Sequence, residues 1–226
     1  MPRVKICSIT DPDDRDAAIA AGADALGFIV DVPVDTDREL PPERAAELIA
    51  DVPPFVMTTL VTMPESADRA RELLDRTGAA AIQIHNDLPP AEFRTLVEAT
   101  DVSAIKRVPA DDPELAGEYD TLADALLVDS VDESGAGGTG HTPDWAATRR
   151  LKDAVDSPVI LAGGLDPENV AAAVRTVEPY AVDVSSGVEA TEGRKDHAAV
   201  SAFIERATTA LDGTDAEFST EEVASR

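Results

Sequence analysis

Two segments, Pro158-Val-Ile-Leu-Ala-Gly-Gly-Leu165 and Tyr180-Ala-Val-Asp-Val-Ser-Ser-Gly-Val-Glu189, carry the strongest indication of the fold. Each is a short apolar run of the strand type that ends in small residues, and one helix-length of sequence separates them. Small residues after a strand leave backbone N–H groups bare in a concave turn, where hydrogen bonds and a helix dipole bind an anion. The loops after strands seven and eight of a (β/α)8 barrel often form such a phosphate site.

The remaining sequence has the alternation that such a barrel requires. Strand-like runs of Val, Ile, Leu and Ala occupy residues 4–7, 25–30, 55–61, 80–85, 103–108, 125–129, 159–162 and 181–185. Helical patterns occupy residues 13–21, 42–51, 65–77, 90–99, 143–156, 167–176 and 196–211. Strands and helices that alternate with short connections predict an α/β protein with a closed, parallel, eight-stranded sheet, a single (βα)8 TIM barrel.

Two parts of the chain depart from this pattern. Residues 109–122 read poorly as a helix, so we expect a weak or missing fifth helix. Residues 212–226 are polar and acidic, and we expect them to form a loosely held tail. With 226 residues and no linker-like segment, the chain predicts one barrel domain over residues 1–211, followed by that tail.

The charge balance excludes several classes of partner. The chain has 45 Asp and Glu against 19 Lys and Arg, a formal net charge of −26. Nucleic acids and anionic membranes need a basic face, so we expect neither as a partner. The acidic residues recur along the whole chain, and this acidic, lysine-poor surface resembles proteins of salt-loving organisms. At about 1 M salt the Debye length is only ~3 Å, which screens the repulsion among these charges. The alternative is an ordinary acidic protein.

The cellular compartment follows from three features of the sequence. The first residues lack the pattern of a signal peptide, and no apolar run approaches the ~18 residues of a membrane span. Cys7 is the single cysteine, so no internal disulfide is possible. We therefore expect a soluble cytoplasmic protein.

Strand alternation predicts which polar side chains face the barrel interior. It places Lys5 and Cys7 on the inner face of the first strand, because Val4 and Ile6 form its apolar face. The same reasoning sends inward the polar residues Gln83 and His85, Lys106, Asp129, and Asp183 and Ser185. Buried charges need partners, so we expect Lys5, Lys106 and Asp183 to neutralise one another in a supporting network.

Cys7 and Asp129 stand at the carboxyl ends of strands one and six, on opposing sides of the barrel mouth. A thiolate and a carboxylic acid that face each other across a cleft form a base and acid pair. Either residue alone has an ordinary structural explanation, since a buried cysteine packs as a small apolar group and Asp129-Ser130 is able to cap a turn. Their shared position above two phosphate-type turns favours catalysis.

At this point the chain resembles the phosphoribosylanthranilate isomerase family of tryptophan biosynthesis. The matching segments span nearly the whole barrel: Val4-Lys-Ile-Cys7, Ala21-Gly-Ala-Asp-Ala-Leu-Gly-Phe28, Ile82-Gln-Ile-His85, Asp129-Ser130, Gly137-Gly-Thr-Gly140, Asp144-Trp145, Leu161-Ala-Gly-Gly-Leu165, Asp183-Val-Ser-Ser-Gly-Val-Glu189 and Gly193-Arg-Lys-Asp196. The resemblance implies an Amadori rearrangement of N-(5-phosphoribosyl)anthranilate to 1-(2-carboxyphenylamino)-1-deoxyribulose 5-phosphate, without a cofactor. Its partner is then a small phosphoribosyl substrate.

The resemblance also implies roles for individual residues. Asp129 would be the general acid on the ring oxygen, and Cys7 the general base on the C2′ proton. An ordinary thiol has a pKa of ~8.5, so a base role favours a nearby cation, which Lys5 could supply in part. Arg38 would bind the anthranilate carboxylate, because a guanidinium fork suits a carboxylate. The phosphate would be held by Gly138, Gly163, Gly164, Ser186 and Gly187.

The chain departs from the family at several loop positions, and other functions stay open. Ser8 and Asn86 replace glycines, and His141 and Pro143 replace Lys and Phe before Asp144-Trp145. One alternative is another phosphosugar isomerase or epimerase barrel, and another is an inactive barrel that only binds a phosphorylated metabolite. The three histidines lie in different units, so no metal site is expected. Either a monomer or a homodimer fits the sequence.

Overall fold

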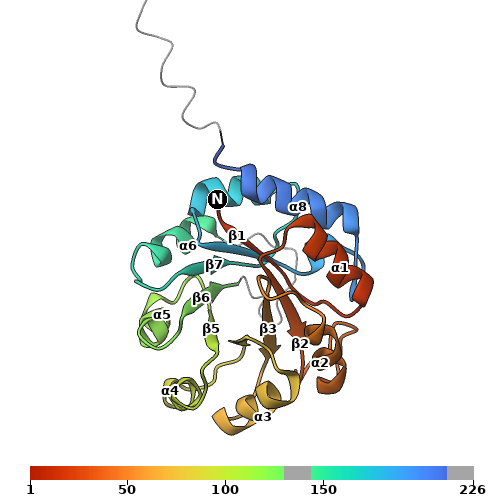
Figure 1. Ribbon diagram of the computed structural model, residues 1–226. Helices are drawn as coiled ribbons and strands as arrows, with labels where there is room; N and C mark the ends of the chain where they lie inside the picture. The colour runs from red at the N-terminus through yellow and green to blue at the C-terminus, as the bar shows by residue number, and fades with distance from the viewer. Residues whose placement is uncertain (130–143, 213–226) are drawn as a thin grey trace, which may run out of the picture.

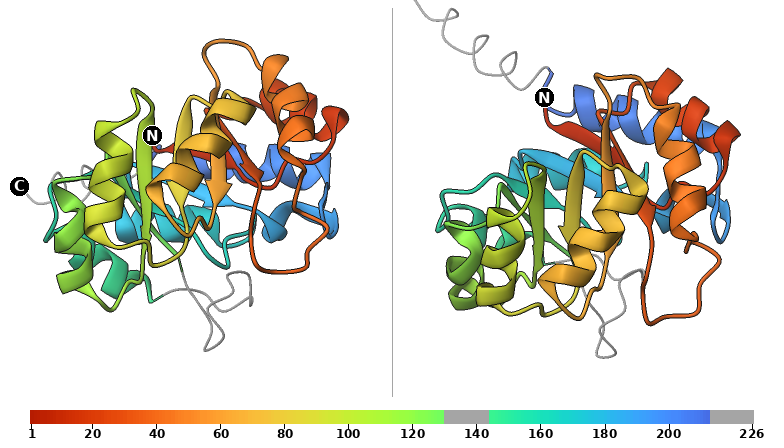
Figure 2. Two further views of the ribbon diagram at one scale, coloured as in Figure 1. Left: turned by 90° about the horizontal axis from the view of Figure 1, so that it is seen from below. Right: turned by 60° about the horizontal axis from the view of Figure 1, so that its bottom comes forward.

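The computed structural model describes residues 1–129 and 144–212 of the chain. Within them, eight parallel strands close into a barrel in chain order, and helices surround it (Figures 1 and 2). The barrel strands are β1 (Arg3–Ile6), β2 (Ala25–Ile29), β3 (Met57–Thr62), β4 (Ala81–Ile84), β5 (Ser103–Val108), β6 (Ala125–Val128), β7 (Val159–Leu161) and β8 (Ala181–Val184). The helices are α1 (Pro12–Ala21), α2 (Pro42–Ala50), α3 (Ala67–Thr77), α4 (Pro90–Glu98), α5 (Pro113–Asp120), α6 (Trp145–Lys152), α7 (Val170–Val177) and α8 (His197–Thr209). The predicted barrel is confirmed.

Closure of the barrel pairs β1 with β8 in parallel register, with Lys5 opposite Asp183. This pairing brings the first residues of the chain beside the segment 180–189, which lies far away in sequence. Since the carboxyl ends of all parallel strands meet at one end of a barrel, the functional end of β1 lies against the turn after β8.

Local sequence signals set the helix starts. Asp11 caps α1 by accepting a hydrogen bond from the Asp13 amide, and Pro12 is the first helical residue. At this position proline loses nothing, because its missing N–H would have no partner inside the helix. Ser66 caps α3 and Asp196 caps α8 in the same manner.

Two apolar cores hold the barrel together. The larger one lies between the strands and the helices, where Phe28, Phe93 and Phe203 are completely buried. The smaller one lies inside the barrel and consists of Ile105, Ala125, Leu127, Ile160, Ala162 and Ala181. Only aliphatic side chains fill this inner core, which fits the low aromatic content of 4%.

The expectation of a weak or missing fifth helix is corrected by the structure. Residues Pro113–Asp120 form α5, capped by the Asp112 side chain, which accepts a hydrogen bond from the Leu115 amide. The helix is only eight residues long and contains Gly117, which explains the faint sequence pattern. Tyr119 anchors it, because its buried ring packs edge-on against Phe93 with ring centroids 5.5 Å apart.

A small hairpin, which the sequence did not predict, follows β8. The turn η1 (Ser186–Val188) leads into β9 (Glu189–Thr191) and β10 (Arg194–Lys195), which pair antiparallel. The two strands are too short to show a period of two, so the sequence pattern carries no signal for them. This hairpin projects charged residues toward the mouth of the barrel.

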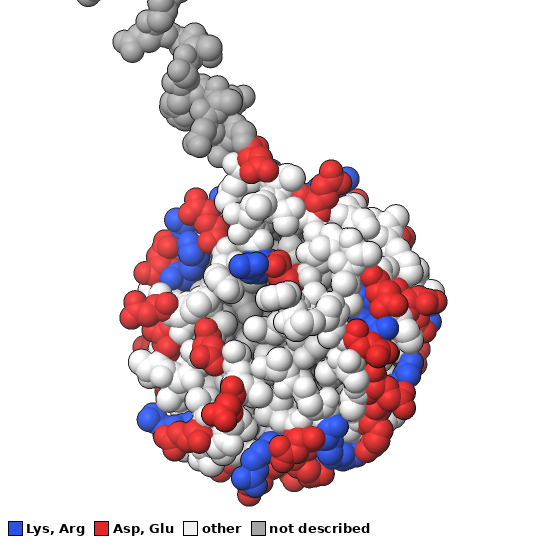
Figure 3. Space-filling model, viewed as in Figure 1, with Lys and Arg blue, Asp and Glu red and all other residues white. Residues whose placement is uncertain are grey.

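The surface carries the acidic excess. In the view of Figure 3, Asp and Glu side chains dominate the rim formed by the outer helices, with Lys and Arg interspersed among them. In residues 1–129 and 144–212 no helix has both the length and the apolar composition needed to cross a lipid bilayer. The acidic tail, residues 212–226, lies outside the described residues except for Asp212.

Candidate active site

A cavity opens at the carboxyl ends of the barrel strands. Its wall includes Cys7 after β1, His85 after β4, Asp129 after β6 and Asp183 on β8. The glycine turn after β7 and the Ser-Ser-Gly turn after β8 complete it. The structure thus brings the sequence-predicted acid, base and phosphate turns to one cavity.

Lys5 and Asp183 form a buried ion pair beneath Cys7. The Lys5 Nζ lies 3.0 Å from Asp183 Oδ1, and both side chains are less than a tenth exposed. Although burial opposes it, the charge of Asp183 holds the pKa of Lys5 above its usual range. Lys5 is therefore a fixed cation, and its charge is largely balanced by Asp183.

Gly27 provides the space for the thiol. A Cβ atom at this position would lie 2.7 Å from Cys7 Sγ and 3.1 Å from Lys5 Nζ. Such distances are shorter than van der Waals contact. The thiol and the ammonium therefore occupy the volume that any other residue at position 27 would fill.

Burial raises the pKa of the Cys7 thiol above its ordinary value. The charges of Lys5 and Lys195 act in the opposite direction, while Asp183 adds to the rise. Because Asp183 balances Lys5, the cation two residues away does not produce a stable thiolate in the free protein. Lys5 thus lowers the pKa of the thiol as expected, but the opposite effect of desolvation is larger.

Asp129 lies beside a neutral histidine. His85 Nε2 is 3.6 Å from Asp129 Oδ2, which is too long for a hydrogen bond. Burial, together with the nearby cations Arg107, Lys5 and Lys106, lowers the pKa of His85 to about 3. At neutral pH His85 therefore places no positive charge beside the Asp129 carboxyl group.

The two small-residue turns lie against each other. Gly163 and Gly164 both have positive φ angles, of 82° and 58°, which glycine adopts without strain. A Cβ atom at Gly187 would lie 1.9 Å from the Leu165 carbonyl oxygen, so only glycine allows this approach. Ser186 lines the cavity beside it. Gly138, also predicted to bind phosphate, lies outside the described residues.

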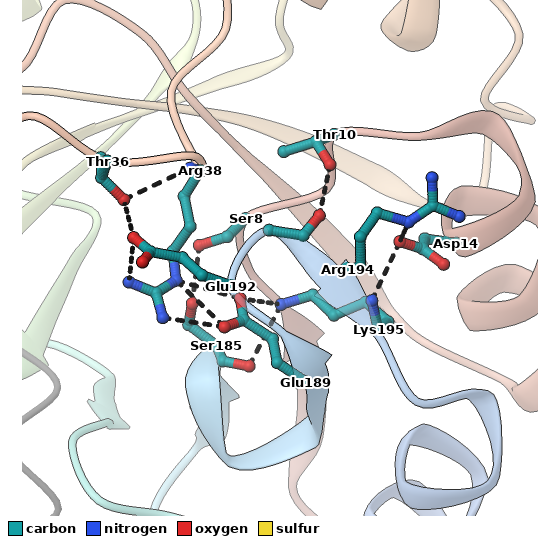
Figure 4. Close-up of polar contacts among 11 residues, drawn as sticks. Ser8, Thr10, Asp14, Thr36, Arg38, Ser185, Glu189, Glu192, Arg194 and Lys195 are labelled. Atoms are coloured by element: carbon teal, nitrogen blue, oxygen red, sulfur yellow. Dashed lines mark hydrogen bonds and ion pairs between the residues drawn. The ribbon is translucent and has the colours of Figure 1, made fainter.

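Arg38 lines the cavity from the loop after β2. Its Nε and Nη2 atoms donate to the Glu189 carboxylate at 3.0 and 2.8 Å. Glu189 also accepts from the buried Lys195 ammonium at 3.1 Å, and Glu192 lies 3.3 Å from Arg38 Nη1. Figure 4 shows this cluster between the β2 loop and the hairpin. The nearby carboxylate of Glu189 raises the pKa of Arg38, although burial opposes the shift.

Ser8 links the thiol to the phosphate turn. Its backbone has a φ of 63°, in the left-handed region, and the residue is completely buried. The hydroxyl oxygens of Ser8 and Ser185 are 2.7 Å apart, a hydrogen bond between the residues that follow β1 and β8. Ser8, at a position where the resemblance implies a glycine, thus has a left-handed backbone that favours glycine, and its hydroxyl adds this hydrogen bond.

Lys106 does not face the barrel interior, which corrects the predicted network of Lys5, Lys106 and Asp183. Its Nζ lies 4.9 Å from the centre of the Tyr119 ring on α5 and donates to the Asn86 carbonyl at 3.0 Å. Burial lowers its pKa to about 8. On β5 the inward positions are Ile105 and Arg107 instead. Both faces of this strand carry one cation, so alternation could not choose between them.

Sequence reasoning also missed Glu189, Glu192 and Lys195 as members of the site. The pattern Glu189-Ala-Thr-Glu-Gly-Arg-Lys195 reads as a solvated loop, whereas Glu189 and Lys195 are in fact buried and paired. A signal was available, because Lys195 is one of only four lysines in the chain. Within the described residues no group of three or more His, Cys, Asp or Glu side chains is arranged to hold a metal ion.

Comparisons with known proteins show the family of this chain. The family model for N-(5'phosphoribosyl)anthranilate (PRA) isomerase matches residues 4–206. A curated N-(5'-phosphoribosyl)anthranilate isomerase from Halorubrum lacusprofundi is 56% identical over 92% of this chain and 97% of its own length. One from Haloferax volcanii is 55% identical over 95% of this chain and 97% of its own length.

Solved structures show the same relationship. The phosphoribosyl anthranilate isomerase from Thermotoga maritima has a TM-score of 0.82 at 36% identity, covering 92% of this chain and 99% of its own. Another, in complex with reduced 1-(o-carboxyphenylamino)-1-deoxyribulose 5-phosphate, has a TM-score of 0.79 at 34% identity and the same coverage. From these matches over nearly its whole barrel, the chain belongs to the N-(5'-phosphoribosyl)anthranilate isomerase family.

Proposed function

We propose that this chain catalyses the Amadori rearrangement of N-(5'-phosphoribosyl)anthranilate to 1-(2-carboxyphenylamino)-1-deoxyribulose 5-phosphate, an isomerisation in tryptophan biosynthesis. The observation that carries the proposal is that Cys7, Asp129 and both phosphate-type turns line one cavity. Family membership and the likeness to a structure holding a reduced product-like ligand support the same substrate.

In the first step Asp129 acts as the general acid. It gives its proton to the furanose ring oxygen, the bond between that oxygen and C1′ breaks, and the nitrogen lone pair forms a C1′=N bond. The product of this step is an open-chain, protonated Schiff base. The His85 ring beside Asp129 is uncharged at neutral pH and places no positive charge at Nε2.

In the second step Cys7 acts as the general base. It removes the C2′ proton, and the electron pair moves through C1′ to the nitrogen to give an enolamine, which tautomerises to the ketone. The buried thiol resists ionisation in the free protein. The cationic Schiff base formed in the first step favours the thiolate, since a nearby opposite charge stabilises the charged form. Ring opening therefore comes before proton removal, because it creates the positive charge that favours the Cys7 thiolate.

Binding relies on the two ends of the substrate. Arg38 takes the anthranilate carboxylate, and Gly163, Gly164, Ser186 and Gly187 hold the phosphate through backbone N–H groups. Gly138 is proposed to contribute from the loop after β6. Lys5, Asp183 and His85 support the reacting groups from below. No cofactor takes part. Cytoplasmic location and a monomeric or homodimeric state stay predictions.

The test uses purified protein at high salt, with enzymatically generated substrate, followed by the loss of anthranilate-type fluorescence. Cys7→Ala and Asp129→Asn should each abolish turnover and leave the fold intact. Asp153→Asn, the same change on the exposed end of α6, should retain full activity. Wild-type protein should also restore growth of a tryptophan auxotroph that lacks the isomerase. A near-native rate in either site variant would refute the assigned roles, and binding without turnover in wild type would indicate an inactive barrel.

A further inference from the structure

The guanidinium group of Arg38 has only one edge left for a ligand. A guanidinium is a flat fork with five N–H donors, and it offers two edges that match a carboxylate. Glu189 occupies the edge formed by Nε and Nη2, at 3.0 and 2.8 Å. A substrate carboxylate must therefore approach the other edge, which consists of Nη1 and the outer hydrogen of Nη2.

In the free protein Glu192 already contacts that edge. Its Oε1 lies 3.3 Å from Arg38 Nη1 and accepts a second hydrogen bond from Thr36 Oγ1 at 2.6 Å (Figure 4). The Glu192 side chain is 47% exposed, whereas that of Glu189 is only 5% exposed. Glu192 therefore lies at the solvent boundary, held by a long contact to Arg38 and a short hydrogen bond from Thr36.

The charge balance of the cluster favours replacement of the Glu192 carboxylate by the substrate carboxylate over binding of both. Arg38 and Lys195 supply two positive charges, and Glu189 and Glu192 supply two negative charges. A third carboxylate would leave a net negative charge in a partly buried site, which is unfavourable. Glu189 is buried between both cations and is costly to remove, whereas Glu192 returns to water at little cost. Departure of Glu192 restores neutrality when a carboxylate arrives.

The backbone around Glu192 is fixed, so only its side chain needs to move. A Cβ atom at Gly193 would lie 2.6 Å from the Asp37 carbonyl oxygen, which shows how closely the hairpin tip packs on the β2 loop. The Thr10 hydroxyl donates to the Gly193 carbonyl, and Arg194 pairs with Asp11. These contacts hold the tip in place while the Glu192 side chain rotates away.

We propose that Glu192 is a surrogate for the substrate carboxylate: it occupies the open edge of Arg38 in the free protein, the substrate displaces it, and it thereby sets the affinity for the carboxylate. This inference rests on the proposed role of Arg38 in substrate binding. Glu192 is a specificity-determining residue, because any substrate without a carboxylate leaves it in place and gains nothing from Arg38.

The test compares Glu192→Gln with wild type. Glutamine keeps the size of the side chain and still accepts the Thr36 hydrogen bond, but it lacks the charge that competes for Arg38. The KM should fall about two- to fivefold, the range expected from an exposed ion pair, with the change in KM rather than kcat. Glu72→Gln is the control, because Glu72 pairs with Arg69 at a similar exposure of 52% on α3. Its KM should equal that of wild type.

A second measurement distinguishes competition between Glu192 and the substrate carboxylate from a general effect of removing one negative charge. The inhibition constant of the reduced product, 1-(o-carboxyphenylamino)-1-deoxyribulose 5-phosphate with its C2′ ketone reduced to an alcohol, should fall in Glu192→Gln by the same factor as the KM. The inhibition constant of the same reduced compound without its carboxylate should stay unchanged. An unchanged or higher KM in Glu192→Gln, or an equal gain for both inhibitors, overturns the inference.

The variant Arg38→Met distinguishes an error in the role of Glu192 from an error in the proposed role of Arg38. If that variant still prefers the inhibitor with the carboxylate, Arg38 is not the carboxylate ligand, and both proposals about this edge fall. If Arg38→Met loses the preference while Glu192→Gln behaves as wild type, only the surrogate role of Glu192 is wrong.

Discussion

Replacing His85 by Gln should remove a specific pH dependence of stability. His85 lies in the cavity wall between Gln83 and Asp129, and its side chain is only 14% exposed. Burial and nearby cations lower its pKa to about 3, from an ordinary value of 6.5. The folded protein therefore keeps this ring neutral over a pH range in which the unfolded chain protonates it. Glutamine has no such titration.

The sign and size of the effect follow from proton linkage. Between pH 6.5 and about 3 the unfolded state binds more protons than the folded state, so stability falls as the pH falls. Each pH unit well below 6.5 costs up to about 1.4 kcal/mol. From pH 7 to pH 5, this one histidine should lower the free energy of unfolding by about 2 kcal/mol. The loss should be absent in His85→Gln.

The assay is chemical denaturation at constant high salt, at pH 7, 6 and 5, for wild type and His85→Gln. Carboxylates titrate in both proteins, so the difference between the two free energies of unfolding isolates the histidine. His197→Gln is the control, because that ring is 49% exposed on the outer surface. If the wild-type and His85→Gln curves run parallel over this pH range, the imidazole is not kept neutral by its surroundings and the reasoning fails.

Three further predictions concern the cavity and the surface. Gly27→Ala should lower kcat about a hundredfold, because its Cβ would lie 2.7 Å from Cys7 Sγ and would displace the thiol. Gly117→Ala is the control and should have a near wild-type kcat, because its Cβ would have no atom within 4 Å. Equal kcat values for the two variants would contradict the packing argument. Gly187→Ala should weaken competitive inhibition by inorganic phosphate about tenfold, because its Cβ would clash with the Leu165 carbonyl oxygen and move the N–H groups of the turn away from the phosphate. An unchanged inhibition constant would exclude this turn from the phosphate site. With a net charge of −26, the protein should need about 1 M salt or more for full stability, measured by thermal unfolding against KCl concentration, and cooperative unfolding undiminished at about 0.01 M salt would count against haloadaptation.

Local patterns in the sequence were sufficient for the barrel and for the residues at its strand ends. Alternating strands and helices predicted the closed sheet, and the inward positions of Cys7, Asp129 and Asp183 followed from a period of two. This reasoning succeeds where one face of a strand is plainly apolar, as in β1. It failed on β5, where Lys106 and Arg107 give both faces one cation.

Residues close together in the chain were enough to predict the fold, the acid and base candidates and the small-residue turns. The charges and partners of those groups could be read only from the folded barrel. The raised pKa of Cys7, the neutral ring of His85 and the occupied edge of Arg38 arise from burial and from side chains that are distant in sequence, such as Lys195 near Cys7 and Glu189 on Arg38. Such contacts depend on how the closed barrel brings β1, β2 and the β8 hairpin together, and electrostatic effects follow distance in space rather than distance along the chain.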